Sequence, residues 1–180
     1  TTHGKRLVAN ITGGAFEGNR LTGTVCSSGA DWIVIDSENL GHIDVRIVLQ
    51  TNDGAHIYVH YTGFLEYNDK FVTAALSGGE TKIGDSYFLS QLRFETGAEK
   101  YKWLNRVLGV GEGRVYPGGI EYQVYEPGPY TLLSLPTPPF LSFSFFSVSF
   151  FFIFFFRWCL ALIFFCFFFS FFFFFSFFLF

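Results

Sequence analysis

A β-hairpin pattern fills residues 43–61, IDVRIVLQTNDGAHIYVHY, and indicates the fold class of the chain. The runs Ile43 to Thr51 and His56 to Tyr61 are rich in β-branched and aromatic residues, and polar and apolar positions alternate along them. Asn52-Asp53-Gly54 lies between the two runs, and an Asp-Gly pair suits the positive φ angles of a tight turn. The stretch therefore predicts two antiparallel strands.

Similar short runs, separated by glycine-rich turns, occur along most of residues 1–130. The further predicted strands are Arg20 to Cys26, Trp32 to Asp36, Phe88 to Phe94, Trp103 to Val110 and Ile120 to Glu126. One short helix is predicted from Asp69 to Leu76, capped by Asn68 or Asp69. GVGEG (109–113) is interpreted as a turn, because it lacks the spacing and the following helix of a nucleotide-binding loop. Many short antiparallel strands predict an all-β sandwich or closed barrel.

The composition divides the chain into two parts. Residues 1–130 hold all 15 acidic residues and 11 of the 12 basic ones, whereas residues 131–180 hold 23 of the 28 Phe and one charge, Arg157. We therefore predict a globular domain over 1–127, a Pro-rich seam over 128–139 and a non-globular Phe-rich tail over 140–180, helical if it is real. The acidic front part excludes a strongly basic nucleic-acid binder.

The Phe-rich tail has two interpretations. Residues 158–180 carry no charge and are long enough to span a membrane. However, Phe, Leu, Ser and Pro, which pyrimidine codons alone can encode, fill 40 of the 50 positions from 131 to 180. We favour a translated non-coding tract, attached by a faulty gene model, over a membrane anchor. The chain also contains no Met, which suggests an incomplete N-terminus.

Polar residues within the apolar strands are the candidates for a site. Alternation places Asp44, Arg46, Val48 and Gln50 on one face of their strand, and the next strand presents His56, Tyr58 and His60 in the same way. Either this face meets water as an exposed hairpin, or Asp44, Arg46 and Tyr58 line a polar pocket. Asp31-Trp32 similarly reads either as a turn with a core tryptophan or as part of that pocket.

No metal site or redox cofactor is predicted. Cys26 has no partner in the front part of the chain, so no disulfide framework follows, and a reducing compartment is expected. His56 and His60 have the spacing of a zinc pair on a helix, but on a strand four residues span about 13 Å. They are interpreted as exposed strand histidines.

An ordered series of segments resembles the DUF3237 family, also called UPF0311, over residues 4–126. The segments are ITGGAFEG (11–18), LTGTV (21–25), GADW (29–32), DVR (44–46), TNDGAHIYV (51–59), YF (87–88), FETG (94–97), YKWLN (101–105), VGEG (110–113) and EYQVYE (121–126). The resemblance implies a small antiparallel, lipocalin-like β-barrel. It also implies an additional strand before Gly4-Lys5-Arg6, which this chain lacks, and no Phe-rich tail.

Some fungal members of this family are similar to cyclases of aromatic polyketide pathways in secondary metabolism, which add a hydroxyl across an alkene without a cofactor. Such chemistry needs a pocket for a flat aromatic, an acid and a base. The expected catalytic residues are Asp31, Asp44, Arg46 and Glu95, with Arg46 keeping Asp44 ionised and burial making Glu95 an acid. The expected substrate-binding residues are Trp32, Tyr58, Tyr87 and Trp103.

The sequence leaves three functions open. The first is a cofactor-independent cyclase or isomerase acting on a small aromatic, polyketide-like substrate. The second is a non-catalytic barrel that binds a small hydrophobic molecule, and the third is a membrane-anchored barrel. The expected location of the barrel domain is the cytoplasm, or the membrane if residues 158–180 are genuine. No nucleic-acid partner is expected, and homo-oligomerisation is left open.

Overall fold

The computed structural model describes residues 1–128 and 139–147. Strands account for most of the secondary structure, with one α-helix, α1 (Asp69–Ser77), and one 3-10 helix, η1 (Glu99–Arg106). The strands are β1 (Lys5–Arg6), β2 (Ala9–Glu17), β3 (Thr22–Asp31), β4 (Val34–Ile35), β5 (Leu40–Thr51), β6 (His56–Glu66), β7 (Phe88–Glu95), β8 (Leu108–Tyr116), β9 (Gly119–Tyr125) and β10 (Leu141–Ser147).

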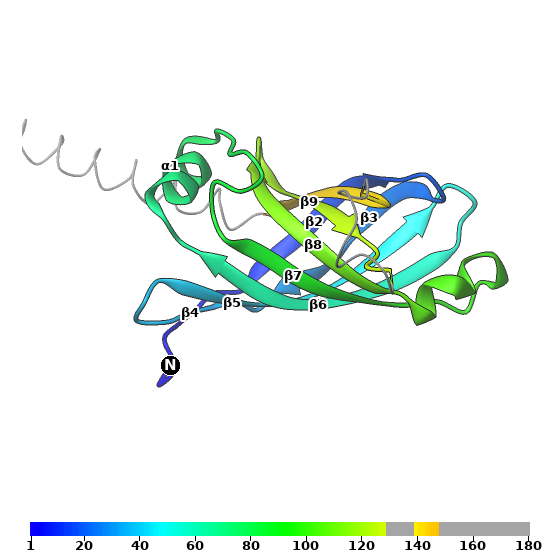
Figure 1. The fold of residues 1–180 in the computed structure, drawn as a ribbon, viewed down its shortest axis with the longest axis horizontal. Helices are drawn as coiled ribbons and strands as arrows, with labels where there is room; N and C mark the ends of the chain where they lie inside the picture. Colours follow the sequence, from blue (N-terminus) through cyan, green and yellow to red (C-terminus); the bar gives the residue numbers. More distant parts are fainter. Residues whose placement is uncertain (129–138, 148–180) are drawn as a thin grey trace, which may run out of the picture.

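Eight strands close into an antiparallel barrel. Their order is β5-β3-β2-β10-β9-β8-β7-β6, and β6 pairs with β5 to complete the ring. The short strands β1 and β4 extend the sheet from β5. Helix α1 lies at one end of the barrel and η1 at the other, beside the β5–β6 turn (Figure 1). The all-β class and the barrel predicted from the sequence are confirmed, with a second short helix beyond the one predicted.

Alternation along the strands builds the core. Along β5, Ile43, Val45, Ile47 and Leu49 point inward and are at most 3% exposed. On the neighbouring strand β6, Ile57, Val59, Tyr61 and Leu65 do the same. Burying side chains of this size removes them from water at a gain of roughly 1.5–3 kcal/mol each, so these inward rows are a main source of the barrel's stability.

The predicted hairpin and helix are both confirmed. Strands β5 and β6 pair in register from Leu40 opposite Glu66 to Gln50 opposite His56, and Gly54 in the turn has a φ of 86°. Asn68 caps α1, because its side chain accepts a hydrogen bond from the backbone N–H of Phe71. The turn residues and the helix cap in this part of the sequence therefore predict the local structure correctly.

Two sequence interpretations in the region 99–113 were wrong. The predicted strand from Trp103 to Val110 is instead the end of η1 followed by the start of β8. The GVGEG segment, interpreted as a turn, lies inside β8 with its three glycines facing the core. A Cβ at Gly113 would come within 2.7 Å of the Phe88 ring, so these glycines make room for large neighbouring side chains rather than for a turn.

The segment predicted to be a non-globular tail differs from that expectation at its start. Residues 141–147 form β10, which pairs with β2 on one side and β9 on the other and so closes the barrel. The reason is an alternation hidden in the Phe run: Leu141, Phe143 and Phe145 are at most 5% exposed, while Ser142 and Ser144 lie between them. Phe145 pairs opposite Gly14 of β2, whose lack of a side chain leaves the strands free to approach closely.

The membrane span proposed for residues 158–180 lies outside the described residues. Within residues 1–128 and 139–147, no helix has the length and apolar character needed to cross a bilayer.

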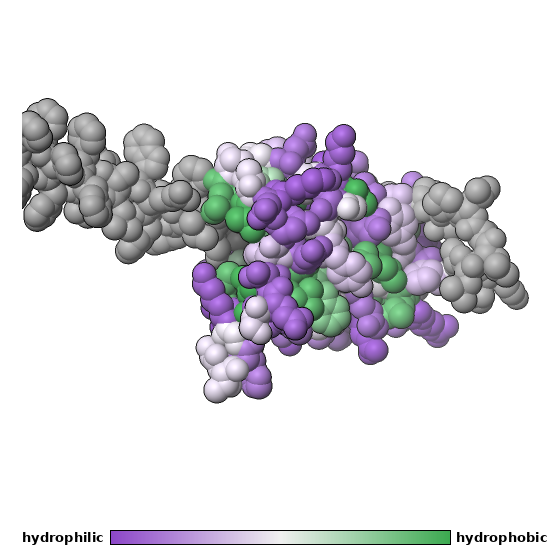
Figure 2. All heavy atoms as spheres, turned by 60° about the vertical axis from the view of Figure 1, so that its left-hand side comes forward, coloured by the Kyte–Doolittle hydropathy of each residue, from purple (hydrophilic) through white to green (hydrophobic). Residues whose placement is uncertain are grey.

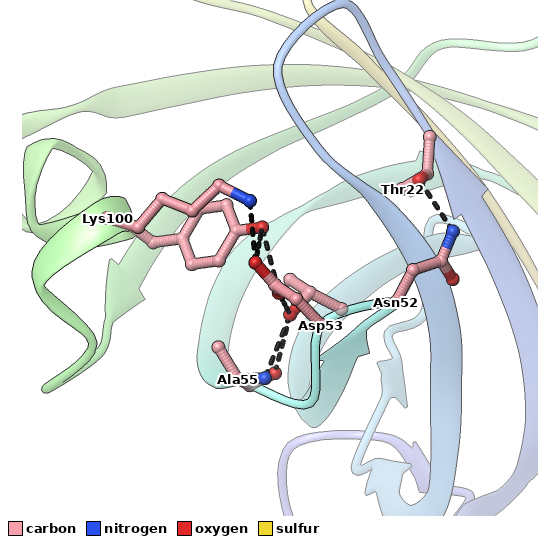
Figure 3. A network of polar contacts seen from close by, with 7 residues as sticks. Thr22, Asn52, Asp53, Ala55 and Lys100 are labelled. Atoms are coloured by element: carbon pink, nitrogen blue, oxygen red, sulfur yellow. Dashed lines mark hydrogen bonds and ion pairs between the residues drawn. The ribbon is translucent and has the colours of Figure 1, made fainter.

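A polar network joins the β5–β6 turn to η1 (Figure 3). Asp53 accepts hydrogen bonds from the Thr51 hydroxyl at 2.5 Å, from the Lys100 ammonium at 2.6 Å and from the Tyr101 hydroxyl at 3.0 Å. The bond from Lys100, followed by that from Thr51, lowers the pKa of Asp53 well below its usual value. The ionised carboxylate therefore holds η1 over this end of the barrel.

We expect Asp53→Asn to lower the melting temperature at pH 7. Because the pKa of Asp53 is lower in the folded protein, its contribution is present above the unfolded pKa of 3.8 and is lost as the pH falls through the folded value. The gap between the variant and the wild type should therefore shrink below about pH 4. Thermal melts between pH 2 and pH 8 measure it. A gap that stays constant with pH would contradict this role for the carboxylate.

Candidate functional site

The carboxyl group of Asp31 points into the barrel at the end that carries α1. Asp31 is the last residue of β3, and it pairs opposite Val45 of β5, whose side chain is fully buried inside. Residues directly opposite in an antiparallel pair share a face, so Asp31 faces the interior too. It remains partly exposed, and its carboxylate lies 3.4 Å from the backbone N–H of Asp44, a weak bond at best.

Three tyrosines share this interior. Tyr61 of β6 pairs opposite Val45, and its ring lies edge-on to that of Tyr122 from β9, with centroids 5.3 Å apart. Tyr67, just after β6, packs against Phe71 of α1. The negative charge of Asp31 contributes to the raised pKa of each of the three phenols, although burial is the larger cause. The carboxyl group and the phenols thus form one electrostatically connected group.

Burial also changes the protonation of Asp31. Desolvation raises its pKa from 3.8 to about 7, the negative charge of Asp44 adds to the rise, and the Asp44 N–H opposes it. At neutral pH the side chain is therefore divided between acid and carboxylate, which is the condition under which one group both gives and takes protons efficiently.

Two hydroxyl groups in this interior have no hydrogen-bond partner among the described residues: those of Tyr61 and Ser90. Both side chains are nearly inaccessible, at 1% and 4% exposure. They lie near enough to the Tyr122 hydroxyl to lower its pKa against the larger effect of burial, but the geometry completes no bond for either of them. Buried hydroxyls without a partner are uncommon and call for an explanation.

The residues expected to be catalytic do not converge. Asp44 and Arg46 lie on the outer face of β5, where Asp44 pairs with Arg46 at 2.9 Å and with His60 at 3.1 Å. Their side chains are 37% and 43% exposed, so among the described residues this face of the hairpin meets water, and Asp44 and Arg46 do not point into the barrel. The physical reason is the alternation of the strand: the neighbouring residues Ile43, Val45, Ile47 and Leu49 are apolar and fill the core.

Glu95 and the expected aromatic residues are likewise dispersed. Glu95 is exposed at the η1 end, opposite Tyr58 on the outer face of β6, so it lacks the burial that was expected to make it an acid. Tyr87, at 55% exposure, lies in solvent. Of the four expected catalytic residues, Asp31 alone faces the interior.

The two tryptophans that were expected to bind substrate lie on the wall and at one end of the barrel. Trp32 lies outside, with the guanidinium of Arg46 5.4 Å from its ring centroid. Trp103 lies in η1 at the end opposite Asp31, where the Arg20 guanidinium stacks 3.4 Å from its ring centroid. Both contacts are of the cation–π kind, which stabilises exposed side chains modestly. Neither indole is placed beside the Asp31 group.

Sequence reasoning missed Tyr61, Tyr67, Ser90 and Tyr122. The signal for Tyr61 was present, because it places a polar hydroxyl in the inward row of Ile57, Val59 and Leu65. Ser90 similarly interrupts the inward row of β7, between Phe88 and Leu92. A polar group at an inward position of an apolar row is the pattern that locates this site.

Two grooves on the outer surface lie away from Asp31 and the buried tyrosines. One, of about 400 Å³, crosses the outer face of β5–β8 beside Phe64, Gln91 and Val110, and another borders α1. Figure 2 shows that hydrophilic side chains cover much of the face it presents, with apolar patches between them. Among the described residues, no three His, Cys, Asp or Glu side chains are grouped so that they could hold a metal ion.

Comparison with known proteins places the chain in a family. A family model described as "Protein of unknown function (DUF3237)" matches residues 1–127. The chain belongs to the DUF3237 family. This DUF3237 protein is 35% identical over 124 residues to a UPF0311 protein of Bradyrhizobium diazoefficiens, covering 68% of the chain and 80% of the relative. It is 30% identical over 126 residues to a UPF0311 protein of Rhodopseudomonas palustris, with the same coverage.

Solved structures of relatives share the fold of this DUF3237 protein. A crystal structure of a conserved protein of unknown function from Rhodopseudomonas palustris matches with a TM-score of 0.56 and 25% identity, over 80% of each chain. A β-barrel-like protein from Acinetobacter baumannii matches with a TM-score of 0.53 and 29% identity, over 82% of this chain and 80% of its own. The barrel is therefore a property that the chain shares with its relatives.

Proposed function

We propose that this protein is a cofactor-independent cyclase or isomerase that moves protons on a small aromatic, polyketide-like substrate at the α1 end of the barrel. The observation that carries the proposal is the inward carboxyl group of Asp31, grouped with the phenols of Tyr61, Tyr67 and Tyr122. An inward carboxyl group beside hydroxyl donors is what proton transfer within a barrel requires.

The surrounding side chains support an aromatic substrate. The rings of Phe88 and Phe143 lie 5.2 and 5.3 Å from that of Tyr122, and Phe71 extends the row toward α1. Flat rings pack favourably against such edge-on and stacked surfaces. In this assignment Asp31 gives and takes the proton, while the phenol hydroxyls hold the oxygen atoms of the substrate.

The alternative is a non-catalytic barrel that binds a hydrophobic small molecule. One observation favours it: Asp44 and Arg46, the carboxylate–cation pair that was expected inside an enzyme's pocket, lie on the outer face. The free thiol of Cys26 is compatible with the cytoplasm as the proposed location of either kind of protein. Both the enzyme and the carrier would bind a ligand in the same interior. A measurement of turnover therefore distinguishes them, whereas a measurement of binding does not.

The test is turnover of hydroxylated aromatic ketones, including polyketide precursors, by the full chain in deuterated water. Ring closure and deuterium incorporation are followed by mass spectrometry. We expect Asp31→Asn to lower the rate by at least about 100-fold, the usual minimum contribution of a positioned acid or base. The dissociation constant should change by less than about ten-fold, because the shape of the side chain is kept.

The matched control is Asp44→Asn, which removes a carboxylate of the same kind from the outer face. Its turnover should stay within about three-fold of the wild type, because Asp44 lies outside the interior and its charge is the smallest of the causes that act on the pKa of Asp31. Full turnover by Asp31→Asn would refute the catalytic assignment. Tight binding of the same compounds by the wild type, with no product formed, would establish the carrier instead.

A further inference from the structure

The rings of Tyr61 and Tyr122 pack against a side chain whose position a ligand could take. The ring of Phe143 stacks on Tyr122, with centroids 5.3 Å apart and planes 25° from parallel, and lies 6.2 Å from the ring of Tyr61. Phe143 is 2% exposed and belongs to β10. A phenyl ring thus packs against the rings of both Tyr61 and Tyr122.

The mismatch between these neighbours is chemical. Phe143 packs a hydrocarbon ring against tyrosines whose hydroxyls burial has removed from water, and it offers these hydroxyls neither a donor nor an acceptor. Among the described residues the hydroxyls of Tyr61 and Ser90 make no hydrogen bond, and leaving such groups unpaired is unfavourable. A ring of the same size carrying an oxygen atom would fill the space and bring a hydrogen-bonding group into this interior.

We infer that Tyr61, Ser90 and Tyr122 form the oxygen-binding end of an aromatic subsite, which takes a flat ring bearing a phenolic or carbonyl oxygen and which the side chain of Phe143 fills in this structure. The inference rests on the proposed function, because it names the substrate class of the same interior. The ring of Phe143 must move before a ligand enters, so a side chain of β10 closes the subsite.

The experiment uses the full chain with Phe143→Ala, which removes the ring and leaves a cavity of its size. Phenol and toluene, which differ in a hydroxyl and a methyl group of similar size, are titrated by calorimetry and by thermal shift. We expect phenol to bind at least ten-fold more tightly than toluene. Adding Tyr61→Phe should reduce this preference to less than three-fold, and Ser90→Ala should reduce it in part. Phe94→Ala, at another buried position, is the matched cavity control and should show no preference for phenol.

Two results would overturn the inference. Equal affinity for phenol and toluene would show a plain apolar cavity, and a preference that survives Tyr61→Phe would place the oxygen elsewhere. Should Phe143→Ala fail to fold, Tyr61→Phe in the otherwise unchanged chain still decides. A melting temperature equal to or above that of the wild type is expected for a hydroxyl without a partner, whereas a clear decrease would mean that the hydroxyl is already paired, with water or protein. None of these readouts depends on Asp31, so the proposed function can fail while the subsite stands.

Discussion

Phe143→Ala is expected to destabilise the protein by about 3–5 kcal/mol, the usual cost of removing a buried phenyl ring. The ring is 2% exposed and contacts the rings of Tyr61, Tyr122 and Phe145 within the barrel. Because many domains of this size are stable by only 5–15 kcal/mol, a loss of that size is easily measured. Equilibrium unfolding in urea, followed by tyrosine and tryptophan fluorescence, gives the change in the free energy of unfolding.

The control for Phe143→Ala is Ser144→Ala on the same strand. Ser144 belongs to the alternate row of β10, which is not part of the core, and its loss should change the stability by less than about 0.5 kcal/mol. A large difference between the two variants would establish in solution the inward and outward faces of β10. Equal, small effects would mean that residues 141–147 do not close the barrel.

Asp31→Asn is expected to stabilise the protein at pH 8. In the folded protein the pKa of Asp31 is raised to about 7, so ionising the buried carboxyl group opposes folding. The folded state therefore binds the proton more tightly than the unfolded state, and stability decreases as the pH rises from about 4 to about 7. The raised pKa corresponds to a loss of at most about 4 kcal/mol in the free energy of unfolding when the carboxyl group ionises. Asparagine stays neutral, so the variant avoids this loss.

The difference between Asp31→Asn and the wild type must depend on pH in a definite direction. At pH 3 both side chains are neutral in both states, so the two proteins should have similar stability, and the gap should open between pH 4 and pH 7. Urea unfolding at a series of pH values measures this gap. Asp44→Asn, on the outer face, is the matched control. Its charge is the smallest of the causes that act on the pKa of Asp31, so its gain at pH 8 should be much smaller than that of Asp31→Asn. A gap that is already full at pH 3 would show that the raised pKa is not its cause.

Most strands of the barrel could be predicted from the sequence, because the patterns that indicate them involve residues close together in the chain. The Asn52-Asp53-Gly54 turn, the alternation along β5 and β6 and the Asn68 cap each depend on neighbouring residues. The position of β10 was not predicted, because closure of a barrel depends on pairing with a distant strand. Within a run of Phe, the short alternation of Leu141, Phe143 and Phe145 with serine is also easily overlooked.

The candidate site shows a different limit of sequence reasoning. Charged residues such as Asp44 and Arg46 drew attention because their chemistry is strong, yet charge is also what keeps a side chain on the outer face. Asp31 was among the residues considered from the sequence, and it faces the interior. The phenols around it were not considered, since a tyrosine in an apolar row resembles an ordinary core residue. Asp31 and these tyrosines could be grouped only once the structure showed which face of each strand points inward.

The pairing of β10 with β2 also has a consequence for the way the chain folds. Phe143 lies opposite Phe16, so the ring of strands is completed by residues from distant parts of the sequence. Contacts of this kind form late and slowly, because a long loop must be ordered before they are made. On the ribosome, β2 emerges long before β10, and until then β2 and β9 each carry an unpaired edge open to other chains. The yield of native protein is therefore governed by a race between late barrel closure and association of these edges, and slower synthesis at lower temperature should favour closure.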